Sequence, residues 1–115
     1  MRIIDKTISI AELGAMAEKM FGNLVKAVVD VRLCLLAVDT ELHSDEEAVL
    51  LDNGSQQADL WGINLYPEYD PADAGFIEFD SMINLRPSQG NRSRGVDSAE
   101  IRQVITDIVR KAVVQ

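Results

Sequence analysis

Residues 24–39 read LVKAVVDVRLCLLAVD, and this stretch decides the fold class. Alternate residues are apolar from Val25 to Ala37, whereas the positions between them include charged residues, namely Lys26, Asp30 and Arg32. Side chains alternate between the two faces of a strand. The stretch therefore predicts one long strand with a wholly apolar face and a mixed face, the pattern of an antiparallel sheet covered on one face.

Three amphipathic helices are predicted around this strand. The first follows Ser9, which has Glu12 at the spacing of a capping box. Ser44 and Glu47 repeat that spacing before a second helix, and Asp97 or Ser98 caps the third. Apolar residues of the third helix recur at helical spacing, so one of its faces docks on the sheet: Ile101, Val104, Ile105, Ile108 and Ala112.

The remaining strands complete the expected topology. Ile3 and Ile4 predict a short first strand, and residues 61–66 and 76–86 predict a hairpin joined by an acidic loop over 67–75. The element order is then β-α-β-α-β-β-α. We predict a single α+β domain over residues 1–115, with a small antiparallel sheet and helices packed on one face.

Composition narrows the class of function. The net charge of −8 opposes nucleic-acid binding and docking on anionic membranes. Cys34, the one cysteine, cannot form an internal disulfide and is expected to be a small buried residue. No stretch is apolar enough for a bilayer span, and the start lacks a signal-peptide core. We expect a cytoplasmic protein that needs no cofactor.

A polar sheet face is the first candidate site. In the predicted last strand, Glu78, Asp80, Met82, Asn84 and Arg86 share one face. Asn64 and Tyr66 of the preceding strand join it, as do the charged residues of the 24–39 stretch. This face is either solvated and crossed by ion pairs, or a ligand groove, or an interface between subunits.

The segment from Arg86 to Gly95 is the second candidate. It reads RPSQGNRSRG and concentrates arginines in an otherwise acidic chain. Arginine binds carboxylate or phosphate through paired N–H donors, and the following helix N-terminus also favours anions. The predicted ligand-binding set comprises Arg86, Ser88, Gln89, Asn91, Arg92 and Arg94, with Asn84, Asn64 and Tyr66. Alternatively, the arginines pair with Glu78, Asp80 or the acidic residues of 68–73.

Two weaker constellations remain. Asp39, Glu41 and His43 alternate along an extended segment and are suitable residue types for a divalent metal, although His43 can equally be a local partner at the start of a helix. Glu78 and Asp80 are candidates for an acid and base pair. Neither pattern establishes a catalytic or metal site, so whether the protein is an enzyme stays open.

Three stretches resemble a family of small uncharacterised bacterial proteins. They are FDSMINLRPSQGNRSRGV at 79–96, AVDTELH at 37–43 and LWGINLYP at 60–67. The resemblance covers nearly the whole chain. It implies a single bacterial domain, and it carries over no catalytic residue, because the family has no assigned activity.

Three functions are therefore considered, in decreasing order of support. The first is a binding module for a small anion or phosphorylated ligand that uses the arginine-rich segment. The second is a hydrolase that uses Glu78 and Asp80, with or without a divalent metal. The third is a homodimeric interaction module that pairs through the polar sheet face or a strand edge.

Overall fold

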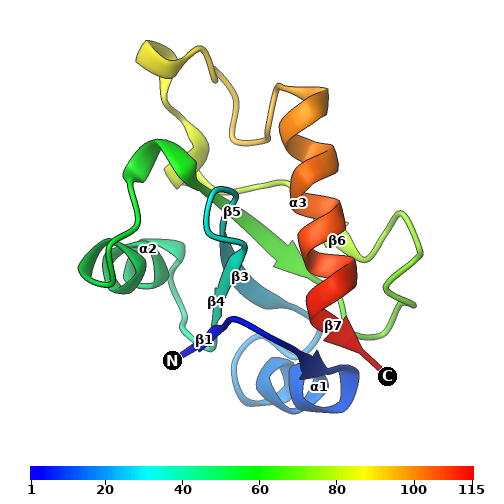
Figure 1. Cartoon of the computed structure of the whole chain (residues 1–115). Helices are drawn as coiled ribbons and strands as arrows, with labels where there is room; N and C mark the ends of the chain where they lie inside the picture. Colours follow the sequence, from blue (N-terminus) through cyan, green and yellow to red (C-terminus); the bar gives the residue numbers. More distant parts are fainter.

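The central element is a five-stranded antiparallel sheet, seen in a computed structural model that describes residues 1–115 (Figure 1). The strand order is β1-β4-β3-β5-β6. The strands are β1 (Arg2–Ile4), β3 (Val25–Asp30), β4 (Leu35–Val38), β5 (Leu60–Leu65) and β6 (Ile77–Glu78). The α+β class and the antiparallel sheet predicted from the sequence are confirmed.

Three helices surround the sheet, together with a small second ladder. The helices are α1 (Ile10–Lys19), α2 (His43–Asp52) and α3 (Ala99–Ala112). Strands β2 (Ile8–Ser9) and β7 (Val113–Val114) pair in parallel and join the two ends of the chain. Short 3₁₀ turns cover Gln57–Asp59, Met82–Asn84 and Pro87–Gln89.

The helices cover both faces of the sheet, which differs from the predicted one-face arrangement. α1 and α3 bury their apolar residues in the main core, against Val25, Ala27 and Val29 of β3. α2 packs on the opposite face, where Leu50 contacts a smaller cluster around Val28. Figure 1 shows α2 and α3 on opposite sides of β3 and β5. The mixed face of the 24–39 stretch is therefore partly covered, not open.

The predicted long strand over 24–39 is wrong, because the stretch folds into the hairpin of β3 and β4. Asp30 is buried at the end of β3, and its Oδ1 accepts the N–H groups of Arg32 and Leu33, each at 2.8 Å. Cys34 takes a left-handed conformation with φ 56° and closes the turn. After the turn, Leu36 and Val38 face the main core in place of the odd-numbered residues.

The predicted strand over 76–86 is also shorter than expected, since only Ile77 and Glu78 pair with β5. The side chain of Asn84 explains the early end. Its Oδ1 accepts the Gly62 N–H at 2.8 Å, and its Nδ2 donates to the Gly62 carbonyl at 2.9 Å. One carboxamide thus takes the backbone bonds that a neighbouring strand would otherwise make.

Helix starts were predicted correctly at two of three places. Ser9 forms the capping box with Glu12, and the Ser98 side chain accepts the Ile101 N–H at 3.2 Å. Ser44 does not cap α2: the helix begins at His43, and its N-cap is Leu42, two residues before the predicted one, which offers no side-chain hydrogen bond. This difference leaves an uncapped helix start beside the sheet.

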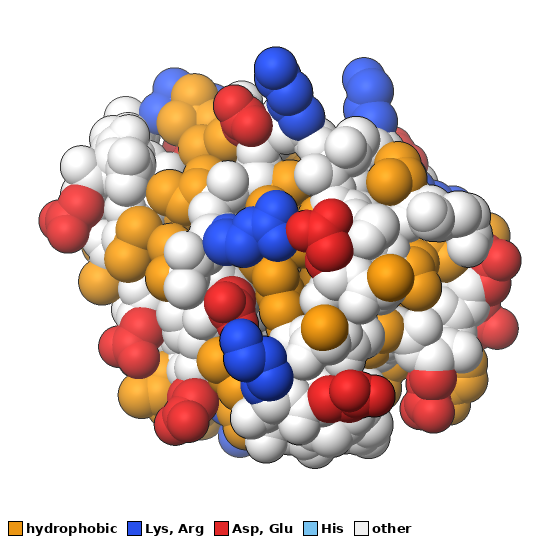
Figure 2. Space-filling view, turned by 90° about the horizontal axis from the view of Figure 1, so that it is seen from below, with side chains coloured by type: hydrophobic (Ala, Val, Ile, Leu, Met, Phe, Trp, Pro, Cys, Tyr) orange, Lys and Arg blue, Asp and Glu red, His pale blue; other side chains and the backbone are white.

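The remaining surface features concern charge and hydropathy. None of the three helices combines the length and apolar content needed to cross a membrane. Figure 2 looks at the end of the molecule where α1 and the two termini lie. Acidic and basic side chains are scattered there among hydrophobic ones, so charges of both signs are interspersed on this face.

Candidate functional site: a polar hollow beside the start of α2

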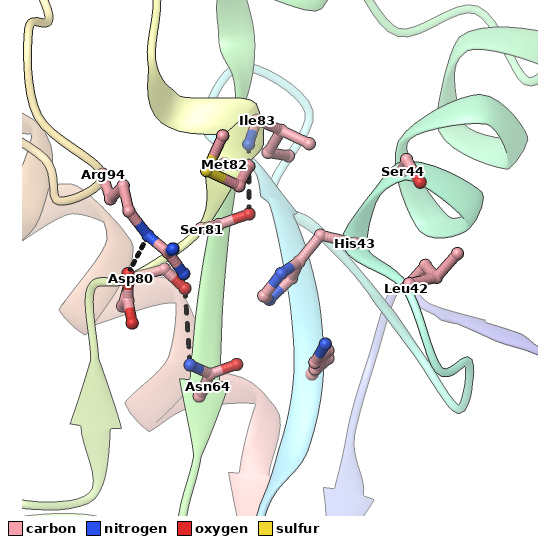
Figure 3. Close-up of a pocket in the computed structure, with 10 residues that line it drawn as sticks. Leu42, His43, Ser44, Asn64, Asp80, Ser81, Met82, Ile83 and Arg94 are labelled. Atoms are coloured by element: carbon pink, nitrogen blue, oxygen red, sulfur yellow. Dashed lines mark hydrogen bonds and ion pairs between the residues drawn. The ribbon is translucent and has the colours of Figure 1, made fainter.

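A hollow of about 210 Å³ lies between the start of α2 and the segment from Asp80 to Arg94. Strands β3 and β5 form its floor, where they contribute Lys26 and Asn64 (Figure 3). These two residues sit opposite each other in the antiparallel pairing of β3 and β5. Their side chains consequently share the face on which α2 packs, and His43 extends over them from the first turn of that helix.

Asn64 presents an oxygen that has no partner. Its Nδ2 donates to Glu78 Oε1 at 2.9 Å and to the Asp80 carbonyl at 3.3 Å, and both partners are acceptors, so the orientation of the amide is fixed. Its Oδ1 makes no hydrogen bond although only 7% of the residue is exposed. Figure 3 shows this oxygen turned away from Asp80, toward the side of the hollow where His43 lies.

His43 is held as a neutral imidazole with a defined tautomer. Its Nε2 lies 2.8 Å from the Ile63 carbonyl oxygen, which can only accept, so Nε2 carries the proton. Nδ1 is then an acceptor. Burial lowers the pKa of His43 below its ordinary value, and the Ile63 hydrogen bond opposes this only in part. The ring points from α2 into the space over β5 (Figure 3).

The charged groups of the hollow carry more positive than negative charge. Arg94 pairs with Asp80, with 2.7 Å between Nε and Oδ1, and both side chains are about half exposed. Lys26 makes no ion pair: its ammonium lies over the Phe21 ring, 4.9 Å from the centroid. The lining of the hollow therefore includes two cations and one carboxylate, next to the uncapped N–H groups that begin α2.

Several predicted ligand-binding residues of the segment from Arg86 to Gly95 make structural contacts outside the hollow. The Arg86 guanidinium donates to the carbonyls of Gln57 and Leu60 and stacks on Trp61, 4.3 Å from the ring centroid. Burial lowers the pKa of Arg86. Gln89 donates to the Ala58 carbonyl at 2.8 Å. Arg86 and Gln89 thus tie this segment to the 57–60 region.

Asn91 organises the rest of the segment. Its Nδ2 lies 2.7 Å from the Asn84 carbonyl and 2.9 Å from the Gly95 carbonyl, and its Oδ1 accepts the Asp97 N–H at 2.8 Å. Ser88 and Arg92 are exposed, and the Arg92 side chain makes no ion pair within the chain. Of the nine predicted ligand-binding residues, only Asn64 and Arg94 line the hollow.

The two carboxylates proposed as an acid and base pair line different hollows. Asp80 lines the hollow beside α2, whereas Glu78 lines a shallower one with Tyr66 and Tyr69. Glu78 Oε1 accepts hydrogen bonds from Asn64 and from the Tyr66 hydroxyl, each at 2.9 Å. Burial, then the hydrogen bond to Glu78, raises the pKa of Tyr66. Glu78 therefore helps to fix the orientation of the Asn64 amide.

The candidate metal ligands do not come together as a set. No group of three His, Cys, Asp or Glu side chains in the structure could hold a metal ion. Asp39 turns the chain at the end of β4 in a left-handed conformation with φ 74°. Of Asp39, Glu41 and His43, only His43 lines the hollow.

Comparison with known protein families gives one match. A family model described as "Protein of unknown function (DUF5674)" matches residues 2–112. The chain belongs to this family. No curated protein matches the chain, and neither does any solved structure. Membership in DUF5674 agrees with the resemblance to an uncharacterised family, and it attaches no activity to any residue.

Some residues of the hollow were missed in the sequence, although parts of the signal were present. Alternation along the strands placed Lys26 and Asn64 on the polar face. Ser44 and Ser81 were missed, because the start of α2 was expected two residues later and Ser81 was assigned to a core-facing strand position. The unpaired Asn64 oxygen leaves no trace in the sequence, since it depends on where Glu78 and Asp80 lie.

Cys34 is exposed in the β3–β4 turn, contrary to the expected buried position. It lines a wider hollow of about 510 Å³ together with Lys6 and Lys111. None of the buried polar atoms left without a partner belongs to a residue of that hollow. The hollow beside α2 is therefore the better candidate site, because its lining includes such an atom, Asn64 Oδ1.

Proposed function

We propose that the protein is a binding module for a small anionic ligand, which it holds in the hollow beside α2. The observation that carries the proposal is the local excess of positive charge: Lys26 and Arg94 line the hollow, Asp80 is its one carboxylate, and an uncapped helix start lies beside them. The chain as a whole has a net charge of −8, so this balance is opposite to that of the rest of the molecule. Carboxylate and phosphate are the groups that such donors bind.

The dimensions of the hollow limit the ligand. Its volume of about 210 Å³ corresponds to roughly seven water molecules at about 30 Å³ each. It is smaller than the pockets of about 300 Å³ or more that hold drug-sized ligands. Leu42 and Met82, both largely exposed, stand at its rim and can cover a short apolar part of the ligand.

The other two functions receive less support from the geometry. A hydrolase that pairs Glu78 with Asp80 would need both carboxylates in one hollow, and they line two. Pairing of sheet edges between two copies would use β1 or β6, which are three and two residues long and offer few backbone groups. A bacterial, cytoplasmic setting remains part of the proposal, on the resemblance and the single cysteine.

Thermal unfolding and calorimetry with inorganic phosphate and with propionate test the proposal. We expect both anions to raise the melting temperature of the wild type in a concentration-dependent way. Arg94→Gln should weaken binding roughly tenfold, the loss of one charge-assisted hydrogen bond. Arg92→Gln is the matched control, because Arg92 lies in the same segment and carries the same charge but does not line the hollow.

Two results would contradict the proposal. One is the absence of any shift with either anion up to high millimolar concentration. The other is an equal loss of affinity in Arg92→Gln and Arg94→Gln, which would mean that the anions respond to the general charge of the segment and not to the hollow.

A further inference from the structure

We infer that the ligand is a small carboxylic acid with an N–H or O–H donor beside its carboxylate, such as an α-hydroxy or α-amino acid. This inference rests on the proposed function and specifies its ligand. It comes from acceptors in the hollow that a plain anion cannot satisfy.

The first acceptor is Asn64 Oδ1. A buried carbonyl oxygen without a hydrogen bond is costly and rare in folded proteins. The nearest candidate to satisfy it within the sheet is Lys26, which sits directly opposite Asn64, but the Lys26 ammonium is turned to the Phe21 ring. A donor from outside the chain is therefore the missing partner of this oxygen.

The second acceptor is Nδ1 of His43. The Ile63 carbonyl fixes the proton on Nε2, so Nδ1 offers a lone pair, and no side chain of the protein donates to it. His43 and Asn64 come from different elements and line the same hollow (Figure 3). Because both acceptors lie on the same side of the hollow, a ligand that satisfies them must carry an N–H or O–H donor.

The guanidinium group of Arg94 lies in a different part of the hollow from these acceptors (Figure 3). Arg94 extends from the far segment, across the hollow from Leu42 and Ser44 of the α2 start (Figure 3). A carboxylate bound by Arg94 leaves the neighbouring substituent of the acid free to reach Asn64 or His43. A simple carboxylate would instead present lone pairs to these acceptors, which is unfavourable.

Three acids with the same carbon skeleton test the inference by calorimetry. Propionate, L-lactate and L-alanine carry hydrogen, hydroxyl and ammonium, respectively, at the carbon next to the carboxylate. We expect lactate or alanine to bind at least tenfold more tightly than propionate, and the better of the two identifies the donor. Ethylamine, which has a donor but no carboxylate, should bind more weakly than either.

The single histidine of the chain gives a direct readout of the donor. His43 is the only source of imidazole ¹⁵N resonances, so Nδ1 can be observed without assignment ambiguity. We expect the Nδ1 resonance to move when lactate or alanine binds, as it accepts a hydrogen bond, and to stay in place with propionate. His43→Gln keeps a donor for the Ile63 carbonyl and removes Nδ1, so it should reduce the preference over propionate.

The outcomes separate the two proposals. If propionate binds in the hollow as tightly as lactate and alanine, and Nδ1 does not move, the inference is overturned and the binding module stands. If none of these compounds binds, both are overturned. Tighter binding of a donor-bearing acid with a shift at Nδ1 supports both.

Discussion

Buried carboxamides fix the geometry around the hollow one residue at a time. Asn84 replaces a strand partner for Gly62, Asn91 gathers three carbonyls of its own segment, and Asn64 joins β5 to the Glu78–Asp80 turn. Each has one donor group and one acceptor group, so a single side chain can bridge two backbone segments. The arginine-rich segment is consequently ordered by amides more than by its charges.

Removal of the Asn91 side chain should release the segment from 86 to 97. Asn91→Ala leaves buried partners unpaired, at about 1–3 kcal/mol for each group that water cannot reach. We expect a loss of roughly 2–4 kcal/mol in the free energy of unfolding, measured by denaturant titration. Amide exchange of the segment should accelerate more than that of β3. Unchanged exchange there would show that other contacts hold the segment.

Glu46 should make the protein less stable as the pH rises. It is completely buried in α2, neither carboxyl oxygen has a hydrogen-bond partner within normal distance, and burial raises its pKa from 4.5 to about 9, although the nearby Thr40 and, to a lesser extent, the charge of Lys26 oppose this rise. Between these pKa values the unfolded chain has lost the proton that the folded chain keeps. The stability that the Glu46 proton contributes is therefore fully present below about pH 4.5, and it is lost progressively as the pH rises toward the folded pKa of about 9.

The comparison of wild type with Glu46→Gln isolates this effect. The difference in free energy of unfolding should change by about 1.4 kcal/mol per pH unit between about pH 6.5 and about pH 8.5, to the disadvantage of the wild type. The range starts there because His43, whose pKa is lowered from 6.5, acts in the opposite direction below it. Parallel pH profiles for the two proteins would refute the buried, protonated carboxyl.

At the scale of elements, the close approach of β5 and the segment from 81 to 84 depends on Gly62. A Cβ at this position would lie 2.5 Å from both Cβ and Oγ of Ser81, atoms too near the backbone to move away. Gly62→Ala should cost about 1–3 kcal/mol in stability and displace Ser81, which lines the hollow. Gly14→Ala, where a Cβ meets nothing within 4 Å, is the control and should raise the stability by about 0.5–1 kcal/mol, because alanine is favoured over glycine inside a helix.

If Gly62→Ala unfolds at the same denaturant concentration as the wild type, the segment from 81 to 84 is not packed as closely on β5 as the structure has it. The affinity of Gly62→Ala for phosphate should fall together with its stability, because the Ser81 N–H donates to the Arg94 carbonyl and both residues line the hollow.

The elements that the sequence predicts are those whose signals are local. Ser9 and Ser98 cap helices through their own neighbours, and Trp61, Ile63 and Leu65 alternate into the core as strand residues do. The β3–β4 turn was missed because its Val-Arg-Leu-Cys sequence has no turn residue. The Asp30 carboxylate holds that turn through hydrogen bonds from the backbone. Its second oxygen accepts a hydrogen bond from the hydroxyl of Ser55, twenty-five residues away.

The position of α2 could not be read from the sequence for a related reason. Its apolar residues run consecutively from Ala48 to Leu51 and form no stripe, so they do not indicate which face of the sheet the helix covers. His43 and Glu46, both buried against the sheet, look like surface residues in sequence. The predicted polar face of the sheet is therefore the face on which the hollow lies, but the helix that walls the hollow was not predicted.

At the scale of the whole molecule, charge distinguishes the hollow from its surroundings. Acidic residues outnumber basic ones by 19 to 11, and on the face in Figure 2 the two signs are interspersed. An anion that approaches the protein thus meets general repulsion, whereas cations prevail locally at the hollow. Anion binding should be confined to that region.

Backbone ¹H–¹⁵N mapping during titration with L-lactate and with inorganic phosphate tests this claim most directly. The account predicts that the largest shifts cluster at residues 42–44, 63–64, 80–83 and 94, which surround the hollow. Shifts concentrated at residues 88–92, or spread evenly over the surface, would contradict it, as would a complete absence of shifts.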